Sequence, residues 1–558
     1  MSVQNELLKY LSNIIVFKDI VLKELLLADS TINPDGTREI TYDEAKNSNI
    51  TLTLINNTIN GNTDITYFNE LQYFPRSGIP NNFLEGCSSL IEIKFPPLRK
   101  CKYNINDGIS VYIGTNILNN SGIKKLDLEG ITSISSTVGG NVTPAFGSMP
   151  NLIEVNIKGV TNFYGNVFMK SNVPNVEKVI ISSLEQWCSL DYNTGVNNDN
   201  GVGFVNNPAC SGKAWLYIGD NNESNKVTDF IIPNSVSTIR PNCFRELQLS
   251  KIIFNHNVSA AKYAFRELSS SADFEGIDDY LVNIGESAFY NCKSTNLIVP
   301  SVCTSVGISA FYGTKITSIN STKLKTIGNN AFDSCYYLTS INIDSDDKTT
   351  LITIGENAFK GTAALTTVYI NKLSNIPKNC FSGSKLTTGT FIGITSIGDS
   401  AFFNCSSLTT ITTKDPNTGT NTVTKIESSA FSNATSLSSI DVDFDKCTYL
   451  GRTLFANNRN IQIPTTLTNL TKIGKSAVSN CKMTGDTVIL PYINNTDANN
   501  LKGVTFEPGS AFYNNYTSPF PINITKIAVP SDLLTWYQTN WANVLSENSG
   551  LSFIAISN

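Results

Sequence analysis

The chain has 558 residues, which is too long for one ordinary globular core, so we expect either several domains or one array that grows by adding repeats. Hydrophobic residues make up 41% and charged residues 16% of the sequence, which argues against extended disorder. The net charge of -5 comes without a basic stripe, which argues against nucleic-acid binding.

The N-terminal segment, residues 1–30, is the first predicted element. Its apolar residues are spaced by three, four or sums of these: Leu7, Leu11, Ile14, Val21 and Leu25. This spacing predicts an amphipathic helix. The segment lacks the basic start, apolar stretch and cleavage site of a signal peptide, and no run of about 18 apolar residues occurs anywhere. We therefore expect neither export by a signal peptide nor membrane insertion.

A repeat follows, and it is clearest between about 230 and 515, where Ile-Gly-x-x-Ala-Phe-x-x-Cys-x-x-Leu-x-x-Ile-x-Ile recurs. One phenylalanine marks each unit, and successive markers lie 21 to 29 residues apart. This period is typical of a leucine-rich-repeat coil, which must stack on its neighbours to bury its apolar face. The markers are Phe244, Phe265, Phe289, Phe311, Phe332, Phe359, Phe381, Phe402, Phe431 and Phe455.

Each half of the unit has a predicted structural role. Ile341 and Ile343 alternate with polar residues, which predicts a short strand with one inner and one solvent-facing side. In the other half, a small residue such as Ala358 lets neighbouring coils approach, and Phe359 fills the space between them. We expect this phenylalanine to form the core of every coil.

Weaker copies extend the array towards the N-terminus, so we place the solenoid at 65–527 with an insertion at about 184–226. Residues 31–64 are predicted to form an irregular cap with strand-like residues 50–55. Residues 528–558 are predicted to form a C-terminal cap, a strand followed by a helix. Ser531 is its expected N-cap, and Trp536 and Trp541 cover the last coil or, alternatively, form an aromatic ligand platform.

Three features together carry a family resemblance. They are the Ile-Gly-x-x-Ala-Phe units, the insertion Leu-Glu-Gln-Trp-Cys at 184–188 leading to Trp-Leu-Tyr-Ile at 215–218, and the restart Val-Thr-Asp-Phe-Ile-Ile-Pro at 227–233. They resemble the BspA-like leucine-rich-repeat family, with departures such as Val478 in place of the marker Phe. The resemblance implies an α/β-type repeat solenoid that binds a partner, as in bacterial surface adhesins, protist surface proteins and proteins of gut-bacterial phages.

The 12 cysteines follow the repeat. Cys292, Cys335, Cys405 and Cys481 each lie three residues after the marker position, and Cys243 and Cys380 immediately precede a marker. Like positions in stacked coils point into one core, where a free cysteine behaves as a small hydrophobe. We expect buried thiols rather than disulfides, as in a reducing compartment.

Catalytic and metal-binding patterns are weak. His256 is the only histidine and follows a predicted strand, so a loop-surface role is expected. Asp344, Asp346 and Asp347 are interpreted as a solvated turn, with weak calcium binding as the alternative. Residues 474–476, Gly-Lys-Ser, lack the earlier glycine of a phosphate-binding loop. We predict no enzyme activity, no cofactor and no metal.

The outward strand residues form the candidate binding face. Its polar, nearly uncharged character suits hydrogen bonding to a glycan or a protein, with Tyr369 as the aromatic anchor. Alternatively, serine and threonine are there only as good solvent-facing strand residues. The predicted residues are Glu92, Lys94, Glu154, Asn156, Ser340, Asn342, Thr367, Tyr369, Thr410, Thr412, Ser439 and Asp441.

Two functional hypotheses follow. The first is a phage virion component, a fibre or head decoration, attached to other virion proteins through the N-terminal helix, whose near-heptad spacing also suits a trimer. It would bind a bacterial surface glycan or protein. The second is a secreted or cell-surface adhesin of a bacterium or protist. A structural assembly protein without a ligand of its own is a further alternative.

Overall fold

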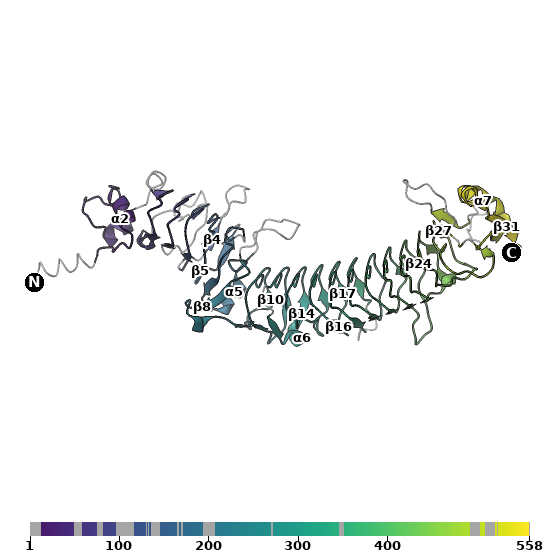
Figure 1. Cartoon of the computed structure of the whole chain (residues 1–558). Helices are drawn as coiled ribbons and strands as arrows, with labels where there is room; N and C mark the ends of the chain where they lie inside the picture. Colours follow the sequence, from purple (N-terminus) through teal and green to yellow (C-terminus); the bar gives the residue numbers. More distant parts are fainter. Residues whose placement is uncertain are drawn as a thin grey trace, which may run out of the picture. The chain divides into compact units, whose positions relative to one another are not determined.

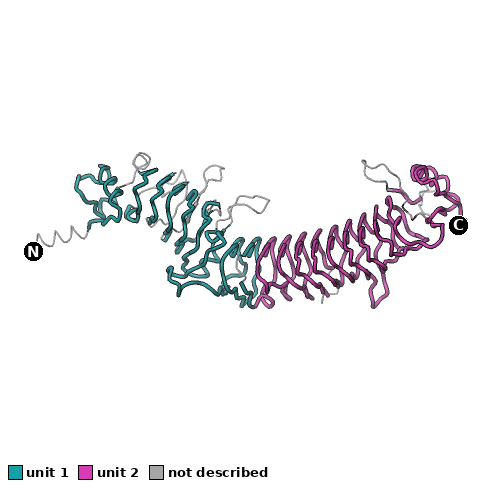
Figure 2. Tube along the Cα trace, viewed as in Figure 1, with its two compact units in different colours: residues 1–275 teal, residues 276–558 magenta. Residues whose placement is uncertain are grey.

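The computed structural model describes residues 13–48, 59–74, 82–95, 116–129, 131, 133–135, 145–164, 167–168, 171–192, 207–268, 272–344, 351–491, 503–507, 519, 521 and 523–556. The chain divides into two compact units, Met1–Glu275 and Gly276–Asn558 (Figure 2). Each unit consists of stacked coils that contribute short strands to parallel sheets (Figure 1).

In the N-terminal unit, six strands pair in parallel in the order β1-β2-β3-β5-β7-β8. These strands are β1 (Tyr67–Phe68), β2 (Glu92–Lys94), β3 (Lys125–Asp127), β5 (Glu154–Asn156), β7 (Lys178–Ile181) and β8 (Trp215–Ile218). The smaller sheets are β4 (Ser133–Ser135) with β6 (Asn162–Tyr164), and β9 (Asp229–Ile231), β11 (Lys251–Ile253) and β13 (Asp273–Glu275). Strand β10 (Thr238–Ile239) pairs in parallel with β12 (Val258–Ala260). The helical elements are α2 (Ile20–Leu27), α3 (Tyr42–Asn47), η2 (Asn69–Tyr73), α5 (Leu184–Ser189) and η3 (Glu223–Asn225).

The C-terminal unit contains the six-stranded sheet with the order β16-β18-β20-β21-β23-β25. Its strands are β16 (Ser318–Ser321), β18 (Ser340–Ile343), β20 (Thr367–Ile370), β21 (Thr388–Phe391), β23 (Thr410–Thr412) and β25 (Ser439–Asp441). Further strands are β14 (Leu281–Ile284), β15 (Ser305–Val306), β17 (Thr326–Ile327) and β19 (Thr353–Ile354), and then β22 (Ser396–Ile397), β24 (Lys425–Ile426), β26 (Tyr449–Leu450), β27 (Lys472–Gly474) and β29 (Thr505–Glu507). Helices α6 (Ile277–Tyr280) and η4 (Phe444–Lys446) lie in the loops.

The marker phenylalanines of this unit form one continuous stack, which confirms their predicted core role. Phe359 lies between Phe332 and Phe381, with ring centroids 5.3 and 5.4 Å away and interplanar angles of 5° and 6°. The stack runs from Phe289 to Phe455, and all its rings are buried. Each coil therefore buries its aromatic ring only because two neighbours are present.

The turn around each phenylalanine requires special backbone geometry on both sides. Asn357 and Gly361 flank Ala358-Phe359 with φ values of 57° and 68°, the left-handed region that asparagine and glycine tolerate best. The glycine of the Ile-Gly pair is needed for close approach, because a Cβ on Gly328 would lie 2.5 Å from the Ile308 nitrogen of the preceding coil. Glycine and alanine together allow this spacing.

The expected continuous N-terminal helix is wrong for residues 13–19, which are not helical. Helix α2 begins only at Ile20, and its buried residues are Leu22 and Leu26, whereas the predicted Val21 is 37% exposed. The predicted Leu7 and Leu11 and the strand-like residues 50–55 lie outside the described residues.

Asp19 explains why helix α2 begins at Ile20. Its carboxylate accepts the Leu22 amide at 2.9 Å, which caps α2, and also the Thr66 amide at 2.6 Å just before β1. Burial opposes ionisation of Asp19, but the hydrogen bonds from Leu22, Thr66 and Tyr67 together lower its pKa. Helix α2 therefore packs on the first coil as an N-terminal cap.

The C-terminal cap has the predicted order of strand and helix, β30 (Lys526–Pro530), η5 (Ser531–Leu533), α7 (Leu534–Asn540) and α8 (Ala542–Glu547). The Trp541 indole is buried and donates to the Val504 carbonyl at 2.8 Å. Ser531 is not an N-cap: its side chain makes no capping bond, and a 3-10 turn precedes α7. The chain then forms β31 (Ser552–Ile556), which pairs with β30, and β28 (Thr487–Ile489) completes this sheet.

Candidate functional site

The predicted face residues lie on two different sheets, one in each unit. Glu92, Lys94, Glu154 and Asn156 are in β2 and β5 of the N-terminal unit. The other eight lie in β18, β20, β23 and β25 of the C-terminal unit, and none of the twelve is buried: Ser340, Asn342, Thr367, Tyr369, Thr410, Thr412, Ser439 and Asp441.

On the N-terminal sheet, opposite charges alternate from strand to strand. Glu92, Lys125, Glu154 and Lys178 are successive partners in register. The Lys125 Nζ lies 3.7 Å from Glu154 Oε1, and the Glu92 carboxylate accepts the Asn69 amide at 2.8 Å. These charged side chains are therefore partnered within the unit, Lys125 with Glu154 and Glu92 with Asn69.

Lys178, at one end of this charged row, and Asn156, in the neighbouring row, also have partners. A hydrogen bond to Glu223 raises the pKa of Lys178, and the two side chains lie 3.1 Å apart. The Asn156 amide donates to Asp127 at 2.9 Å. A ligand on this face would have to compete with existing contacts.

The C-terminal sheet presents two straight columns of outward side chains. The first column is Ser318, Ser340, Thr367, Thr388, Thr410 and Ser439. The second is Asn320, Asn342, Tyr369, Thr390, Thr412 and Asp441. Within the part of the chain that the structure describes, the hydroxyls of the first column make no hydrogen bond, so they are free to meet a ligand.

Four column members were missed by the sequence analysis: Ser318, Asn320, Thr388 and Thr390. Strand β21 escaped because Gly389 stands where other units have isoleucine or valine. A signal was available, since Ser318 and Thr388 follow their marker phenylalanines by seven residues, against eight in the other units of this sheet.

A third set of hydroxyls, one residue earlier in each strand, has a structural role. The Thr366 hydroxyl donates to the Thr339 carbonyl at 3.2 Å, and the Thr387 hydroxyl donates to the Thr366 carbonyl at 2.8 Å. Thr409 repeats the bond to Thr387 at 2.9 Å. These hydroxyls link neighbouring coils through hydrogen bonds. They are therefore less available to a ligand than the hydroxyls of the first column.

Tyr369 is the only aromatic residue of the two columns. Burial raises the pKa of Tyr369, and the carboxylates of Asp344 and Asp415 raise it further. The Asn371 amide donates to Asp344 at 2.9 Å, which orients that carboxylate beside the ring. The ring is half-buried, and the raised pKa keeps its hydroxyl protonated at neutral pH.

The remaining sequence candidates have ordinary surroundings. His256 Nε2 lies 2.7 Å from the Val236 carbonyl in a half-buried loop. Asp346 and Asp347 lie outside the described residues. Gly474 ends β27, where a Cβ would collide with the Arg452 backbone, so this glycine serves coil stacking.

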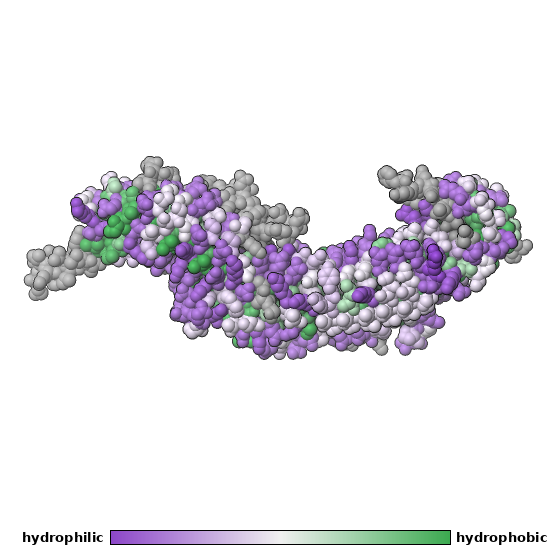
Figure 3. Space-filling view, in the orientation of Figure 1, coloured by the Kyte–Doolittle hydropathy of each residue, from purple (hydrophilic) through white to green (hydrophobic). Residues whose placement is uncertain are grey.

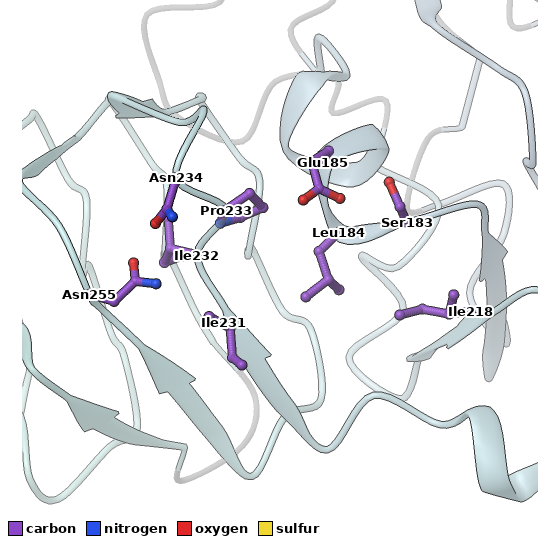
Figure 4. Close-up of a pocket in the computed structure, with 9 residues that line it drawn as sticks. All are labelled: Ser183, Leu184, Glu185, Ile218, Ile231, Ile232, Pro233, Asn234 and Asn255. Carbon is purple, nitrogen blue, oxygen red and sulfur yellow. The ribbon is translucent and has the colours of Figure 1, made fainter.

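One cavity lies beside α5 in the N-terminal unit, with a volume of about 360 Å³ (Figure 4). Leu184, Ile218 and Ile231 form much of its wall, and Glu185 is the only carboxylate among its lining residues. A single carboxylate does not provide the acid and base pair that glycoside hydrolysis requires.

The eleven cysteines within the described residues are free and buried, which confirms the thiol prediction for them. The Cys335 thiol donates to the Phe311 carbonyl at 3.0 Å, and burial raises its pKa to about 11. No helix among the described residues is long and apolar enough to cross a membrane.

Several solved structures resemble the chain. A leucine-rich repeat protein from Bacteroides ovatus is 17% identical, with 61% of this chain and 90% of that chain covered and a TM-score of 0.32. A leucine rich cell surface protein from Faecalibacterium prausnitzii is 18% identical, with 62% and 93% covered and a TM-score of 0.28. The pneumococcal vaccine antigen PcpA is 14% identical, with 61% and 91% covered and a TM-score of 0.29.

No curated protein matches the chain by sequence. The family described as BspA type leucine rich repeat region matches it in six copies, over residues 221–275, 261–388 and 374–500. These ranges overlap and run from 221 to 500, which is half of the 558 residues. The repeat period, the parallel strands and the aromatic stack agree with that match. The chain belongs to the BspA-type leucine-rich-repeat family.

Proposed function

We propose that this protein is a non-catalytic recognition protein of a bacterial surface and binds a neutral glycan through the outward face of the β16–β25 sheet. The observation that carries the proposal is the aligned first column, whose hydroxyls make no hydrogen bond among the described residues. Neighbouring strands lie about 4.8 Å apart, so an extended ligand would meet an equivalent donor at each coil.

The chemistry of the columns favours a neutral sugar over an anionic ligand. They contain hydroxyls, amides and one carboxylate, Asp441, but no lysine or arginine. Hydroxyl and amide groups both donate and accept, as sugar hydroxyls do. The exposed side of the Tyr369 ring would pack against the apolar face of a sugar ring.

The surface assignment draws on the family and on a similar protein that is named a cell surface protein. Leucine-rich repeats of this kind are binding modules. The phage-virion hypothesis, with its virion partners and trimer, stays a prediction. One of its two arguments is an attachment helix at the N-terminus, and the described part of that segment, including Leu22 and Leu26, is packed as a cap.

Binding of the fluorescently labelled full chain to intact gut bacteria tests the proposal. We expect strain-selective binding that enzymatic deglycosylation of the cells abolishes. Tyr369→Ala should weaken binding about tenfold, the loss expected of an aromatic anchor. Tyr312→Ala is the matched control, because Tyr312 is half-buried in the same unit and stacks on Tyr290, away from the columns. Equal loss in both variants, or binding that survives deglycosylation, contradicts the proposal.

A further inference from the structure

Strand β31 leaves one edge of the cap sheet, the sheet β28-β30-β31, without a neighbouring strand. It pairs in parallel with β30 along all five of its residues, Ser552 to Ile556. Its sequence, Ser-Phe-Ile-Ala-Ile, contains neither a charge nor a proline, two features that commonly protect a strand edge from pairing. Ile554 is 36% exposed, and Ala555 is exposed as well. The edge is therefore suited to accept another strand.

The register of β31 determines which of its backbone groups point away from the sheet. The Ser552 amide donates to the Thr525 carbonyl at 2.9 Å, so the backbone of Ser552 faces β30. Backbone groups alternate in direction along a strand, so Ile554 also bonds to β30, whereas Phe553 and Ala555 direct their amides and carbonyls outwards. Within the described residues, no backbone hydrogen bond reaches these outward groups. Two residues of the strand therefore present free donors and acceptors along the edge.

We propose that β31 pairs antiparallel with β31 of a second copy of this chain, about a two-fold axis that passes through Ile554. Phe553 then exchanges both backbone hydrogen bonds with Ala555 of the second copy, and Ala555 does so with Phe553 of the second copy. Ile554 lies opposite its own counterpart in a non-hydrogen-bonded pair, with Cα atoms about 4.5 Å apart. Every outward backbone group of the strand has a partner in this arrangement, so the edge is complementary to itself.

The side chains at this edge also fit a second copy. Residues 548–556 include no charged side chain, so two identical strands meet without like-charge repulsion. The two Ile554 side chains form an apolar cross-strand pair. On the other face of the strand, the Phe553 ring packs on Tyr537 and Trp541 at centroid distances of 5.4 and 5.8 Å. These ring contacts hold β31 in place before it pairs.

The opposite edge of the cap sheet is already bonded. The Ile489 amide donates to the Thr465 carbonyl at 2.9 Å, and the Leu467 amide donates to the Ile489 carbonyl at 3.2 Å. A head-to-tail array, in which β31 of one copy adds to β28 of the next, would break these bonds. The pairing therefore closes as a dimer rather than growing into a filament.

The dimer is expected to be weak. A single pair of short strands buries much less than the roughly 1,600 Å² of a standard interface, so we expect a Kd on the order of 10 μM. Sedimentation velocity of the full chain at about 1 to 100 μM should show a shift from monomer to dimer and no larger species. A chain that stays monomeric over this range, or that forms trimers or larger species, overturns the proposal without any substitution.

Charge substitutions at the axis test the geometry of the pair. Ile554→Lys places two ammonium groups opposite each other and should weaken dimerisation about tenfold, and Ile554→Glu should do the same. An equimolar mixture of the two variants should restore a dimer with one copy of each, because opposite charges then face each other across the axis. This restoration also shows that both variants are folded.

Ile489→Lys is the matched control. Ile489 is 38% exposed in the same sheet, at the edge that is already bonded, so this substitution should leave the dimer unchanged. Equal losses in Ile489→Lys and Ile554→Lys, undiminished dimerisation of Ile554→Lys, or a mixture that stays monomeric would contradict pairing through β31. The inference does not rest on glycan binding, and the measurement includes no glycan, so the two proposals fail separately.

Discussion

The six-stranded sheets β1–β8 and β16–β25 are built alike but present different outer faces. In the N-terminal unit, Lys125 lies between Glu92 and Glu154 in register, and the charges pair across strands. In the C-terminal unit, Thr367 and Thr388 stand at equivalent positions with free hydroxyls. One strand pattern can thus support a self-paired face or a face whose hydrogen-bonding groups remain for a ligand.

The cores beneath the two faces differ as well. The C-terminal unit stacks its marker phenylalanines, from Phe289 to Phe455, with ring planes within 10° of parallel. In the N-terminal unit, Phe146 contacts Phe95 and Phe168 at 47° and 31°.

Figure 3 shows hydrophobic surface over the N-terminal cap, where Val16 is 85% and Ile20 68% exposed. Regular stacking and a uniform polar face therefore occur together in the C-terminal unit.

The largest expected effect comes from breaking the stack. Phe359→Ala removes a ring that contacts two neighbours and should lower the free energy of unfolding by about 3–5 kcal/mol. Denaturation followed by Trp536 and Trp541 fluorescence measures this loss in the C-terminal unit. Phe403→Ala is the control, because Phe403 is half-buried outside the stack. Equal losses in both variants would show that a stacked phenylalanine contributes no more to the free energy of unfolding than a phenylalanine outside the stack.

The next effect tests a local compensation inside the same sheet. A Cβ on Gly389 would lie 2.6 Å from the Phe391 ring, which fills the space that isoleucine or valine occupies in other coils. Gly389→Val should therefore destabilise the protein by about 1–3 kcal/mol. Adding Phe391→Ile, the residue type at Ile343 and Ile370, should restore most of the loss in thermal melts. An additive double variant would disprove the compensation.

The N-terminal cap should depend on pH. The pKa of Asp19 is lower in the folded protein than its unfolded value of about 3.9, so its contribution is present above that pH and is lost as pH falls through the folded pKa. Asp19→Asn should destabilise the N-terminal unit by about 1–2 kcal/mol at neutral pH and remove part of the acid dependence. Denaturation at pH 7 and pH 3, read from Trp187 and Trp215, measures both.

Asp35→Asn provides the control for this prediction. Asp35 is exposed and accepts a hydrogen bond from the nearby Thr37 amide. It should leave stability nearly unchanged at both pH values. An Asp19→Asn variant with the parent's acid dependence would rule out the proposed role of this carboxylate.

The smallest effect is expected on the charged face. Lys125→Gln breaks a long ion pair whose lysine is half exposed, and should cost no more than ~0.5 kcal/mol. Raising the salt concentration should reduce this cost further, because exposed charges are screened. Thr410→Val on the neutral face should show no salt dependence at all. A cost above ~2 kcal/mol for Lys125→Gln would mean that the charged row is a main source of stability.

Much of the fold follows from local spacing alone. Markers such as Phe359 repeat at nearly constant intervals, and only stacked coils can bury one ring per interval. Alternation along strands such as β20 separates inward from outward residues, which is why the candidate columns were largely predictable. Helix α3 was not predicted, but the sequence contains a local signal for it, because Thr41 and Glu44 form a capping box.

Tertiary contacts determine where helix α2 begins and which side chains pair between coils. The register of α2 depends on Asp19 reaching Thr66, which lies 47 residues away. The ion pair of Lys125 with Glu154 and the hydrogen bond from the Trp187 indole to the Cys243 carbonyl likewise join residues from different coils. A repeat period specifies which positions are equivalent but not which side chains meet across coils, because insertions of varying length separate them. The sequence by itself therefore specified the coil and its two faces, and the stacked structure decided which polar groups are paired and which remain free.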